Sequence, residues 1–289
     1  MFKLLAILIM TLDHIGLYLG TAGLLPDTVV LILRLIGRLA FPMFTWLLVM
    51  GYERTGNLIR YFLRLVIIGL LTQAADIMLN RFLGNPLPGA NILFSLAVAL
   101  VALCALNLTI DSGRSMMLTM QMSAPYAKDL KLPVDQTVRV NFNRFEIPAR
   151  LGLIIGILML ILCVTVTIVA NLMYGLYGLA MALLFGLYRR FAGSDDPLNR
   201  SGLRVIYYRN LSYLYLSFCL LALLVDWLIK QQDFSFALLQ FAAVGAVALF
   251  PLSAKDPKPR PYLRYLFYFY YPAHILLLQI IAALLGGKL

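Results

Sequence analysis

Long apolar stretches alternate with short polar segments along this chain. A helix needs about 20 consecutive, mostly apolar residues to cross the hydrocarbon core of a bilayer. About nine stretches have roughly that length, and we interpret each as a transmembrane helix. They cover about residues 4–22, 28–51, 58–77, 90–110, 151–170, 172–188, 205–229, 234–252 and 262–286.

The composition agrees with a membrane protein. Hydrophobic residues occupy 62% of the 289 positions and charged residues only 13%, whereas soluble domains average about 25% charged residues. The apolar stretches leave little sequence for a separate soluble module. We therefore predict an all-α protein, a polytopic membrane helix bundle, that forms a single transmembrane domain over residues 1–289.

The basic residues favour one orientation of this bundle. The formal net charge is +11, and most of the 24 Lys and Arg residues fall at Lys3 or in the segments 54–64, 111–150, 189–209 and 253–264. These segments all lie on one side of the predicted membrane, as expected for cytoplasmic loops. We therefore expect the N-terminus in the cytoplasm and the C-terminus outside. Because the positive charge follows the topology, it does not indicate a nucleic-acid partner.

The longest polar stretch is an insertion at residues 111–150. Within it, residues 137–146 alternate partly between apolar and polar side chains, which predicts a short strand or hairpin. The insertion is either a solvated cytoplasmic loop or a lid or partner-docking element.

The cysteines do not suggest a functional site, and the first apolar stretch does not suggest a signal peptide. Cys104, Cys163 and Cys219 lie inside apolar stretches without metal-binding spacing, so we expect neither a metal nor redox chemistry. Asp13 and His14 interrupt the first stretch, which is otherwise long enough to span a bilayer. We therefore interpret it as an uncleaved helix rather than a signal peptide.

Two histidines mark the candidate site, and the chain has no others. His14 follows Asp13 near the centre of the first predicted span, and His274 lies midway along the last. Ionisable residues at this depth are costly in hydrocarbon and usually face the interior of a bundle or a watery cavity. We therefore expect the first, second and last spans to bring a polar cluster together at one depth.

The second predicted span adds two arginines to this cluster. Arg34 and Arg38 are four residues apart and share one helix face. Pro42 has no amide hydrogen, so the carbonyl of Arg38 loses its helical donor and the helix can kink there. Arg38 lies at a depth similar to that of Asp13, and we expect the two to form an ion pair.

The chemistry of this cluster has two interpretations. An imidazole titrates near neutrality and is the commonest general base, so His14 or His274 can take a proton from an attacking nucleophile. The alternative is that both histidines only form hydrogen bonds between helices. A rival class of function is a proton-coupled transporter that uses Asp13, Arg38 and the histidines as its substrate site.

Several segments together resemble the TraX family, and the elements DHIG, GRLAFP and YPAH are specific in combination. The matching segments are Ile9–Gly16, Arg34–Phe44, Gly51–Leu65, Asn91–Leu100, Tyr174–Arg190 and Tyr265–Leu278. The family is named for a conjugative-plasmid protein that acetylates the N-terminus of F-type pilin. It is similar to membrane acyltransferases that use acyl-CoA.

The resemblance implies a multi-pass enzyme of the bacterial inner membrane that takes an acetyl group from cytosolic acetyl-CoA. The acceptor implied is a pilin-like amine, with a glycan or lipid group as the other possibility. The positions that match the family's polar motifs are Asp13, His14, Arg38 and His274. Phosphate groups of coenzyme A bind basic side chains, and the candidates are Arg34, Arg54, Arg60, Arg64, Arg189 and Arg190. Each of these has an alternative role in topology or in contact with membrane lipid.

For the mechanism, we expect His14 to act as the general base toward the acceptor. Arg38 would stabilise the oxyanion or organise Asp13. His274 would be a second acid or base, or would bind the thioester carbonyl. Direct transfer and a route through an acetyl-histidine intermediate are both open.

Overall fold

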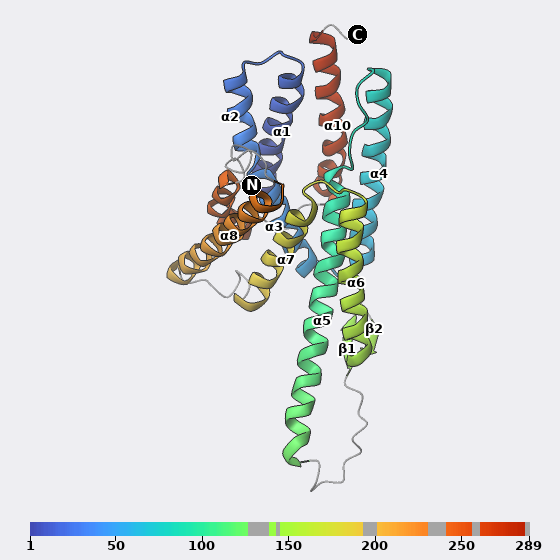
Figure 1. Cartoon of the computed structure of the whole chain (residues 1–289), viewed down its shortest axis with the longest axis vertical. Helices are drawn as coiled ribbons and strands as arrows, with labels where there is room; N and C mark the ends of the chain where they lie inside the picture. The colour runs from blue at the N-terminus through green and yellow to red at the C-terminus, as the bar shows by residue number, and fades with distance from the viewer. Residues whose placement is uncertain (127–138, 143–144, 193–200, 231–240, 256–260, 287–289) are drawn as a thin grey trace.

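The computed structural model describes residues 1–126, 139–142, 145–192, 201–230, 241–255 and 261–286. Almost all of these residues are helical, as Figure 1 shows, which confirms the all-α class. The helices are α1 (Phe2–Thr21), α2 (Asp27–Gly37), α3 (Ala40–Arg54), α4 (Leu58–Phe82), α5 (Ile92–Tyr126), α6 (Ala149–Val169), α7 (Gly175–Ala192), α8 (Ser201–Lys230), the 3-10 helix η1 (Ala243–Lys255) and α10 (Pro261–Leu285).

Seven helical segments of the described chain are long and apolar enough to cross a membrane. They are α1, α2 together with α3, α4, the first 27 residues of α5, α6, α8 and α10. The span predicted at 172–188 is α7, which is not among the seven and carries Arg189 and Arg190 in its last turn. Part of the span predicted at 234–252 lies outside the described residues, and η1 makes up most of the rest. The chain is thus a multi-pass membrane protein, and its cytoplasmic N-terminus stays a prediction.

The second predicted span is broken where proline was expected to disturb it. Helix α2 ends at Gly37, α3 begins at Ala40, and Arg38 and Leu39 form a turn between them. Pro42 cannot donate to the carbonyl of Arg38, so the regular hydrogen-bond ladder fails at this point. The predicted kink is therefore confirmed.

Helices α1 and α2 pack closely because glycines occupy their contact. A Cβ atom at Gly16 would lie 2.9 Å from Leu33 Cβ, and one at Gly37 would lie 2.1 Å from Asp13 Oδ1. Only a residue without a side chain allows the two backbones to approach this far. The close approach at Gly37 brings α2 directly against the Asp13 carboxylate.

Replacing Gly37 with alanine is expected to force α1 and α2 apart and to lower the free energy of unfolding by about 1–3 kcal/mol, the usual cost of overpacking. Thermal unfolding in detergent measures the effect. Gly113→Ala is the matched control, since a Cβ atom there meets nothing within 4 Å. Equal melting temperatures for the two variants would contradict the close approach.

An aromatic core joins α3, α7, α8 and η1. Trp46 stacks on Phe250 with ring centroids 4.7 Å apart, and Phe185 lies edge-on to Trp46 and to Tyr215. All four side chains are fully buried. The indole nitrogen of Trp46 donates a hydrogen bond of 3.0 Å to Ser253 Oγ, so the buried polar atom is satisfied. This core holds α3, and therefore the chain that follows the kink, in place.

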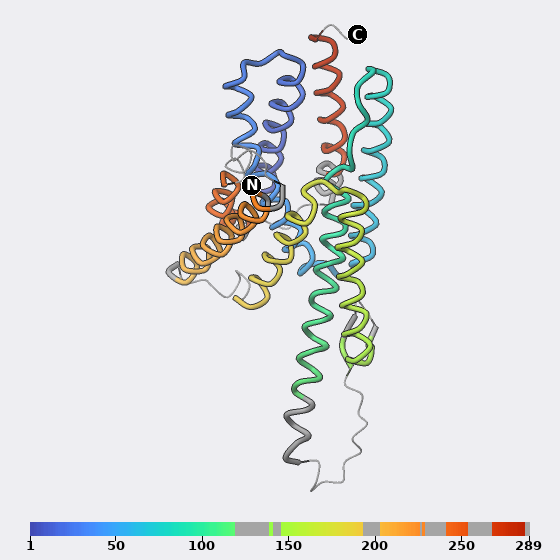
Figure 2. The backbone as a smooth tube through the Cα atoms, in the orientation of Figure 1, coloured from blue at the N-terminus to red at the C-terminus, as the bar shows by residue number. Residues whose placement is uncertain are grey.

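The first and last helices of the chain belong to a row of four helices. Figure 1 shows α2, α1, α10 and α4 in this order, and each contacts its neighbour. Helices α1, α4 and α10 all finish at the same end of the molecule, as the tube in Figure 2 shows. We call this the upper end, defined by Thr21, Phe82 and Leu285.

Helices α4 and α10 run parallel. The guanidinium carbon of Arg64 lies 6.0 Å from the centre of the Tyr268 ring. Farther toward the upper end, Gln279 Nε2 donates to Asp76 Oδ1 at 2.6 Å. The number of residues from Arg64 to Asp76 on α4 is nearly the same as from Tyr268 to Gln279 on α10, as expected for parallel helices. His274 lies between them on α10, and this order positions the candidate site.

The hairpin predicted within 137–146 is present. Strand β1 (Arg139–Phe142) pairs antiparallel with β2 (Phe145–Pro148), and Arg139 lies opposite Pro148. Val140 is buried in a small cluster with Leu108 of α5 and Ala149 of α6. The hairpin therefore packs against the α5–α6 pair.

The first part of the predicted insertion at 111–150 is helical rather than a loop. Helix α5 has 35 residues and continues to Tyr126. The apolar pattern fades after residue 110, but no proline interrupts the helix before Pro125. Residues 127–138 lie outside the described part of the chain, so a solvated loop and a lid or docking element both stay open.

Candidate active site

The two histidines lie side by side at the contact between α1 and α10. His14 Nδ1 and His274 Nε2 are 2.7 Å apart, and the two rings are parallel within 7° with centroids 4.9 Å apart. His274 is 5% exposed, and His14 is partly buried. The prediction that the first and last spans meet at these residues is confirmed.

The hydrogen bonds assign a tautomer to each neutral ring. His274 Nδ1 lies 2.8 Å from the carbonyl oxygen of Tyr270, and only a protonated nitrogen can donate to a carbonyl. His274 Nε2 is therefore an acceptor, and His14 Nδ1 donates to it. The lone pair of His14 is then on Nε2, which makes no hydrogen bond to the described residues. This nitrogen is the atom of the pair that can take a proton.

Aromatic residues hold the pair from both sides. The Tyr270 ring stacks on His274 with centroids 5.0 Å apart, and the Tyr18 ring lies edge-on to His14 at 6.0 Å. The hydroxyl of Thr11 donates to a backbone carbonyl one turn earlier, so the Tyr270 hydroxyl donates to Thr11 Oγ1 at 2.7 Å. These contacts orient both imidazoles.

Asp13 forms an ion pair with Arg34, whose Nη1 donates to Asp13 Oδ2 at 2.8 Å. The sequence favoured Arg38, one turn later on the same helix face, as the partner. Arg38 acts on Asp13 through its charge and forms a hydrogen bond with the Tyr174 hydroxyl. Both guanidinium groups therefore neutralise the carboxylate, and Arg34 also acts electrostatically on His14.

A second polar group, which the sequence analysis missed, lies one helical turn above the histidines. Gln279 Nε2 donates to Asp76 Oδ1 at 2.6 Å and to the Tyr18 hydroxyl at 3.2 Å. Asn80 Nδ2 also donates to Asp76 Oδ1, at 2.8 Å. The third predicted span ended at residue 77, which put Asp76 at a boundary, but α4 continues to Phe82. The carboxylate inside an apolar stretch was the signal that could have identified it.

Arg189, predicted as a ligand of coenzyme A, is a structural residue here. Its Nε and Nη2 donate to the two carboxylate oxygens of Glu53 at 2.8 and 2.7 Å. Its side chain is only 3% exposed, and its guanidinium carbon lies 5.0 Å from the centre of the Trp46 ring. This bidentate pair links α3 to α7.

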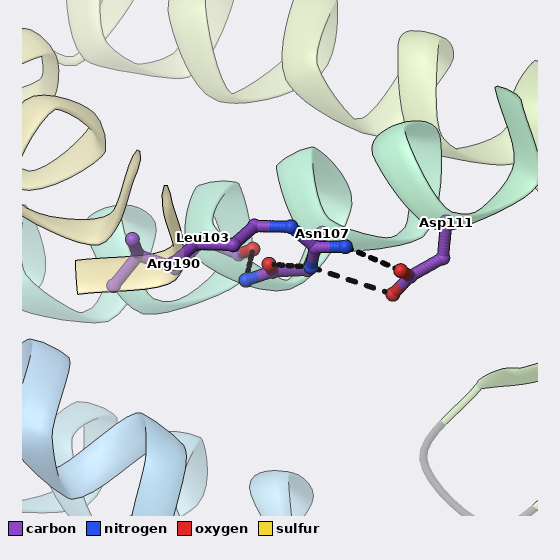
Figure 3. A network of polar contacts seen from close by, with 4 residues as sticks. All are labelled: Leu103, Asn107, Asp111 and Arg190. Atoms are coloured by element: carbon purple, nitrogen blue, oxygen red, sulfur yellow. Dashed lines mark hydrogen bonds and ion pairs between the residues drawn. The ribbon is translucent and has the colours of Figure 1, made fainter. Parts of the chain in front are cut away.

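Arg190 is also engaged within the protein. Figure 3 shows its guanidinium group between the amide oxygen of Asn107 and the carboxylate of Asp111, to both of which it donates. Asn107 Nδ2 in turn donates to the carbonyl of Leu103 at 2.9 Å. The network fixes the end of α7 to α5.

The remaining predicted ligands of coenzyme A lie where α3 ends and α4 begins. Arg54 and Arg60 are exposed, and Arg64 is half-buried. Arg64 Nε donates to the carbonyl of Arg60 at 3.1 Å, and its guanidinium group lies near the rings of Tyr61 and Tyr268. These three arginines are the basic candidates that no carboxylate pairs with in the described chain.

The described residues contain no group of His, Cys, Asp and Glu that could hold a metal ion. The three cysteines are buried and unpaired, and each lies inside a helix rather than at the histidine pair. The lone pair on His14 Nε2 offers acid-base chemistry by a side chain.

A known protein family matches nearly the whole chain. The TraX protein family matches residues 1–282, a range that includes α1, α2, α4 and the part of α10 that carries His274 and Gln279. Neither the curated proteins nor the solved structures give a match. Since the family match covers nearly the whole chain, this multi-pass membrane protein belongs to the TraX family.

Proposed function

We propose that the protein is an acetyltransferase of the bacterial inner membrane. It transfers an acetyl group from cytosolic acetyl-CoA to an amine, as on a pilin N-terminus, or to a hydroxyl of a glycan or lipid. The observation that carries this proposal is the hydrogen-bonded pair of His14 and His274, which leaves His14 Nε2 as a base without a partner among the described residues. Membership of the TraX family supports the pilin-like acceptor.

The residues of this site account for every bond and proton in the proposed transfer. The acceptor nitrogen or oxygen attacks the thioester carbonyl carbon while His14 Nε2 takes its proton. When the tetrahedral intermediate collapses, the carbon–sulfur bond breaks and the thiolate of coenzyme A leaves. The His14 imidazolium then returns the proton to the sulfur. The products are the acetylated acceptor and coenzyme A with a free thiol.

His274 and the arginines assist this step. His274 Nε2 accepts the hydrogen bond from His14 Nδ1, so it holds the ring in the tautomer that the base needs and stabilises the imidazolium that forms. The positive charges of Arg34 and Arg38, beside Asp13, favour the negative charge that develops on the thioester oxygen.

The donor is proposed to bind at Arg54, Arg60 and Arg64, whose guanidinium groups suit the phosphates of coenzyme A. Arg64 lies against Tyr268, six residues before His274 on α10, which corresponds to a rise of about 9 Å along the helix. The slim pantetheine arm would carry the thioester along this path to the histidine pair.

Replacing both Arg60 and Arg64 with alanine is expected to raise the KM for acetyl-CoA about tenfold or more, since each lost charge-assisted hydrogen bond is worth about 1.5–3 kcal/mol. The kcat should change little because the base is intact. Arg81→Ala, at the other end of α4, is the control and should leave the KM unchanged. An unchanged KM in the double variant would place the donor elsewhere.

The experiment that tests the function uses the purified protein in lipid nanodiscs with acetyl-CoA and an extract of bacterial membranes as the acceptor source. Release of the coenzyme A thiol and acetylation of a membrane component are expected. Acid-quenched mass spectrometry of the protein separates the two routes, since acetyl-His14 forms only in the two-step route. Failure to bind or consume acetyl-CoA, together with proton-coupled substrate uptake by proteoliposomes, would support the transporter instead.

A further inference from the structure

We infer that Asp76, Gln279 and Tyr18 form a binding site for a primary ammonium group of the acceptor, one helical turn above the histidine pair. The inference rests on the proposed acetyl transfer, and it specifies which acceptor group the site recognises and where it binds. The three residues come from α4, α10 and α1, the same helices that surround His14 and His274.

Asp76 carries a carboxylate within a membrane-spanning helix. The hydrogen-bond partners of this carboxylate are all neutral. Its Oδ1 accepts from the side-chain amides of Gln279 and Asn80. Within the described chain, no lysine or arginine pairs with it, and its Oδ2 accepts no hydrogen bond. Asp76 is half-buried, and a negative charge in a membrane-spanning segment is costly unless a cation or strong donors compensate it. A bound cation would supply the compensation that the described residues do not provide.

Gln279 gives a second, independent indication of the same ligand. The residue is 6% exposed, and its Oε1 atom is buried without a hydrogen-bond partner in the described structure. Both of its amide hydrogens have acceptors, at Asp76 and at Tyr18. A buried acceptor left unsatisfied costs about 1–3 kcal/mol. The ligand that satisfies it must be a donor.

A primary ammonium group meets both requirements, because it carries a positive charge and three N–H donors. Asp76 Oδ2 and Gln279 Oε1 offer the acceptors. Tyr18 and Tyr271 are close enough to Asp76 to act on it electrostatically, and aromatic rings also attract cations. A hydroxyl group has one donor and no charge, so it would leave the carboxylate uncompensated.

The position of the site separates the two substrates. Tyr18 is four residues after His14, and Gln279 is five residues after His274, both toward the upper end. Arg60 and Arg64 lie at the opposite end of α4. The histidine pair thus lies between the proposed donor path and the ammonium site. An acceptor arriving from the upper end would bind by its ammonium group. This group must first lose one proton to solvent, and the neutral amine that results is the nucleophile that attacks the thioester.

The test measures binding to the purified full chain in detergent without acetyl-CoA, so its result does not depend on transfer activity. The probes are triglycine amide with a free N-terminal amine, its counterpart with a hydroxyl in place of that amine, and the N-acetylated peptide. An N-acetylated peptide that carries one lysine distinguishes a side-chain ammonium from an N-terminal one. We expect an ammonium-bearing probe to bind at least tenfold more tightly than the hydroxyl and acetylated probes.

Asp76→Asn should remove this preference and leave binding of acetyl-CoA unchanged, because asparagine keeps the Oδ1 acceptor for Gln279 and Asn80 and loses only the charge. Asp27→Asn, an exposed carboxylate at the start of α2, should keep the preference. Equal binding of all probes by the wild-type protein would overturn the inference even if Asp76→Asn does not fold. A preference that survives in folded Asp76→Asn would also overturn it. A normal preference without any acetyl transfer would instead refute the proposed function.

Discussion

Replacing His14 with asparagine is expected to reduce acetyl transfer by about 10²–10⁴-fold, the usual contribution of a general base. Asparagine places an amide nitrogen near the position of Nδ1, so the hydrogen bond to His274 Nε2 is retained. The variant loses only the Nε2 atom that takes the proton. Steady-state kinetics with the purified protein measure the loss, and thermal unfolding shows whether the variant is folded.

Two substitutions of His274 provide the matched comparison. Glutamine places an oxygen near Nε2 and still accepts from His14 Nδ1, whereas asparagine keeps only the donor to the Tyr270 carbonyl. His274→Gln should therefore retain clearly more activity than His274→Asn, and both should retain more than His14→Asn. The reverse order, with His274 essential and His14 dispensable, would contradict the assignment of the base.

Replacing Glu53 with alanine is expected to lower the free energy of unfolding by about 3–5 kcal/mol, because it leaves the buried guanidinium of Arg189 without its carboxylate. The measurement is the unfolding midpoint in detergent with increasing denaturant. This variant tests whether Arg189 is a structural residue rather than a ligand of coenzyme A.

Asp111→Ala serves as the control for Glu53→Ala. Asp111 pairs with Arg190 but its side chain is 51% exposed, and exposed pairs contribute about 0–1 kcal/mol. The two variants should thus differ clearly in stability. Equal stabilities would show that the Glu53–Arg189 pair does not hold α3 and α7 together.

Much of the fold followed from the apolar pattern because bilayer thickness determines the length of a spanning helix. Seven predicted spans, the break near Pro42 and the hairpin within 137–146 are present. The pattern was less informative at η1, since apolar content alone does not distinguish a spanning α-helix from a shorter 3-10 segment. The apolar pattern also predicted too short a helix for α5, because it stops at residue 110 and the helix continues to Tyr126. Polar helical turns beyond the membrane leave no apolar pattern.

The site was only partly predictable. His14 and His274 could be placed in one cluster because ionisable residues in a membrane span usually face the interior of the bundle. Their direct hydrogen bond was not predicted. Arg34 was underestimated as the partner of Asp13 because depth was judged from the midpoint of the predicted second span, 28–51, which lies near Arg38. Counted from the short turn between α1 and α2, Asp13 and Arg34 are nearly the same distance from it. This count stays within α2 and does not cross the break at Arg38 and Leu39.

Labelling with acetyl-CoA shows whether the histidine pair transfers acetyl groups. Bacterial membranes that contain the wild-type protein, His14→Asn or no copy of the chain are incubated with acetyl-CoA radiolabelled in the acetyl group. We predict a labelled membrane component with the wild-type protein that is absent from the other two samples. Equal labelling by wild-type protein and folded His14→Asn, or no labelled component with the wild-type protein, would refute acetyl transfer by this pair.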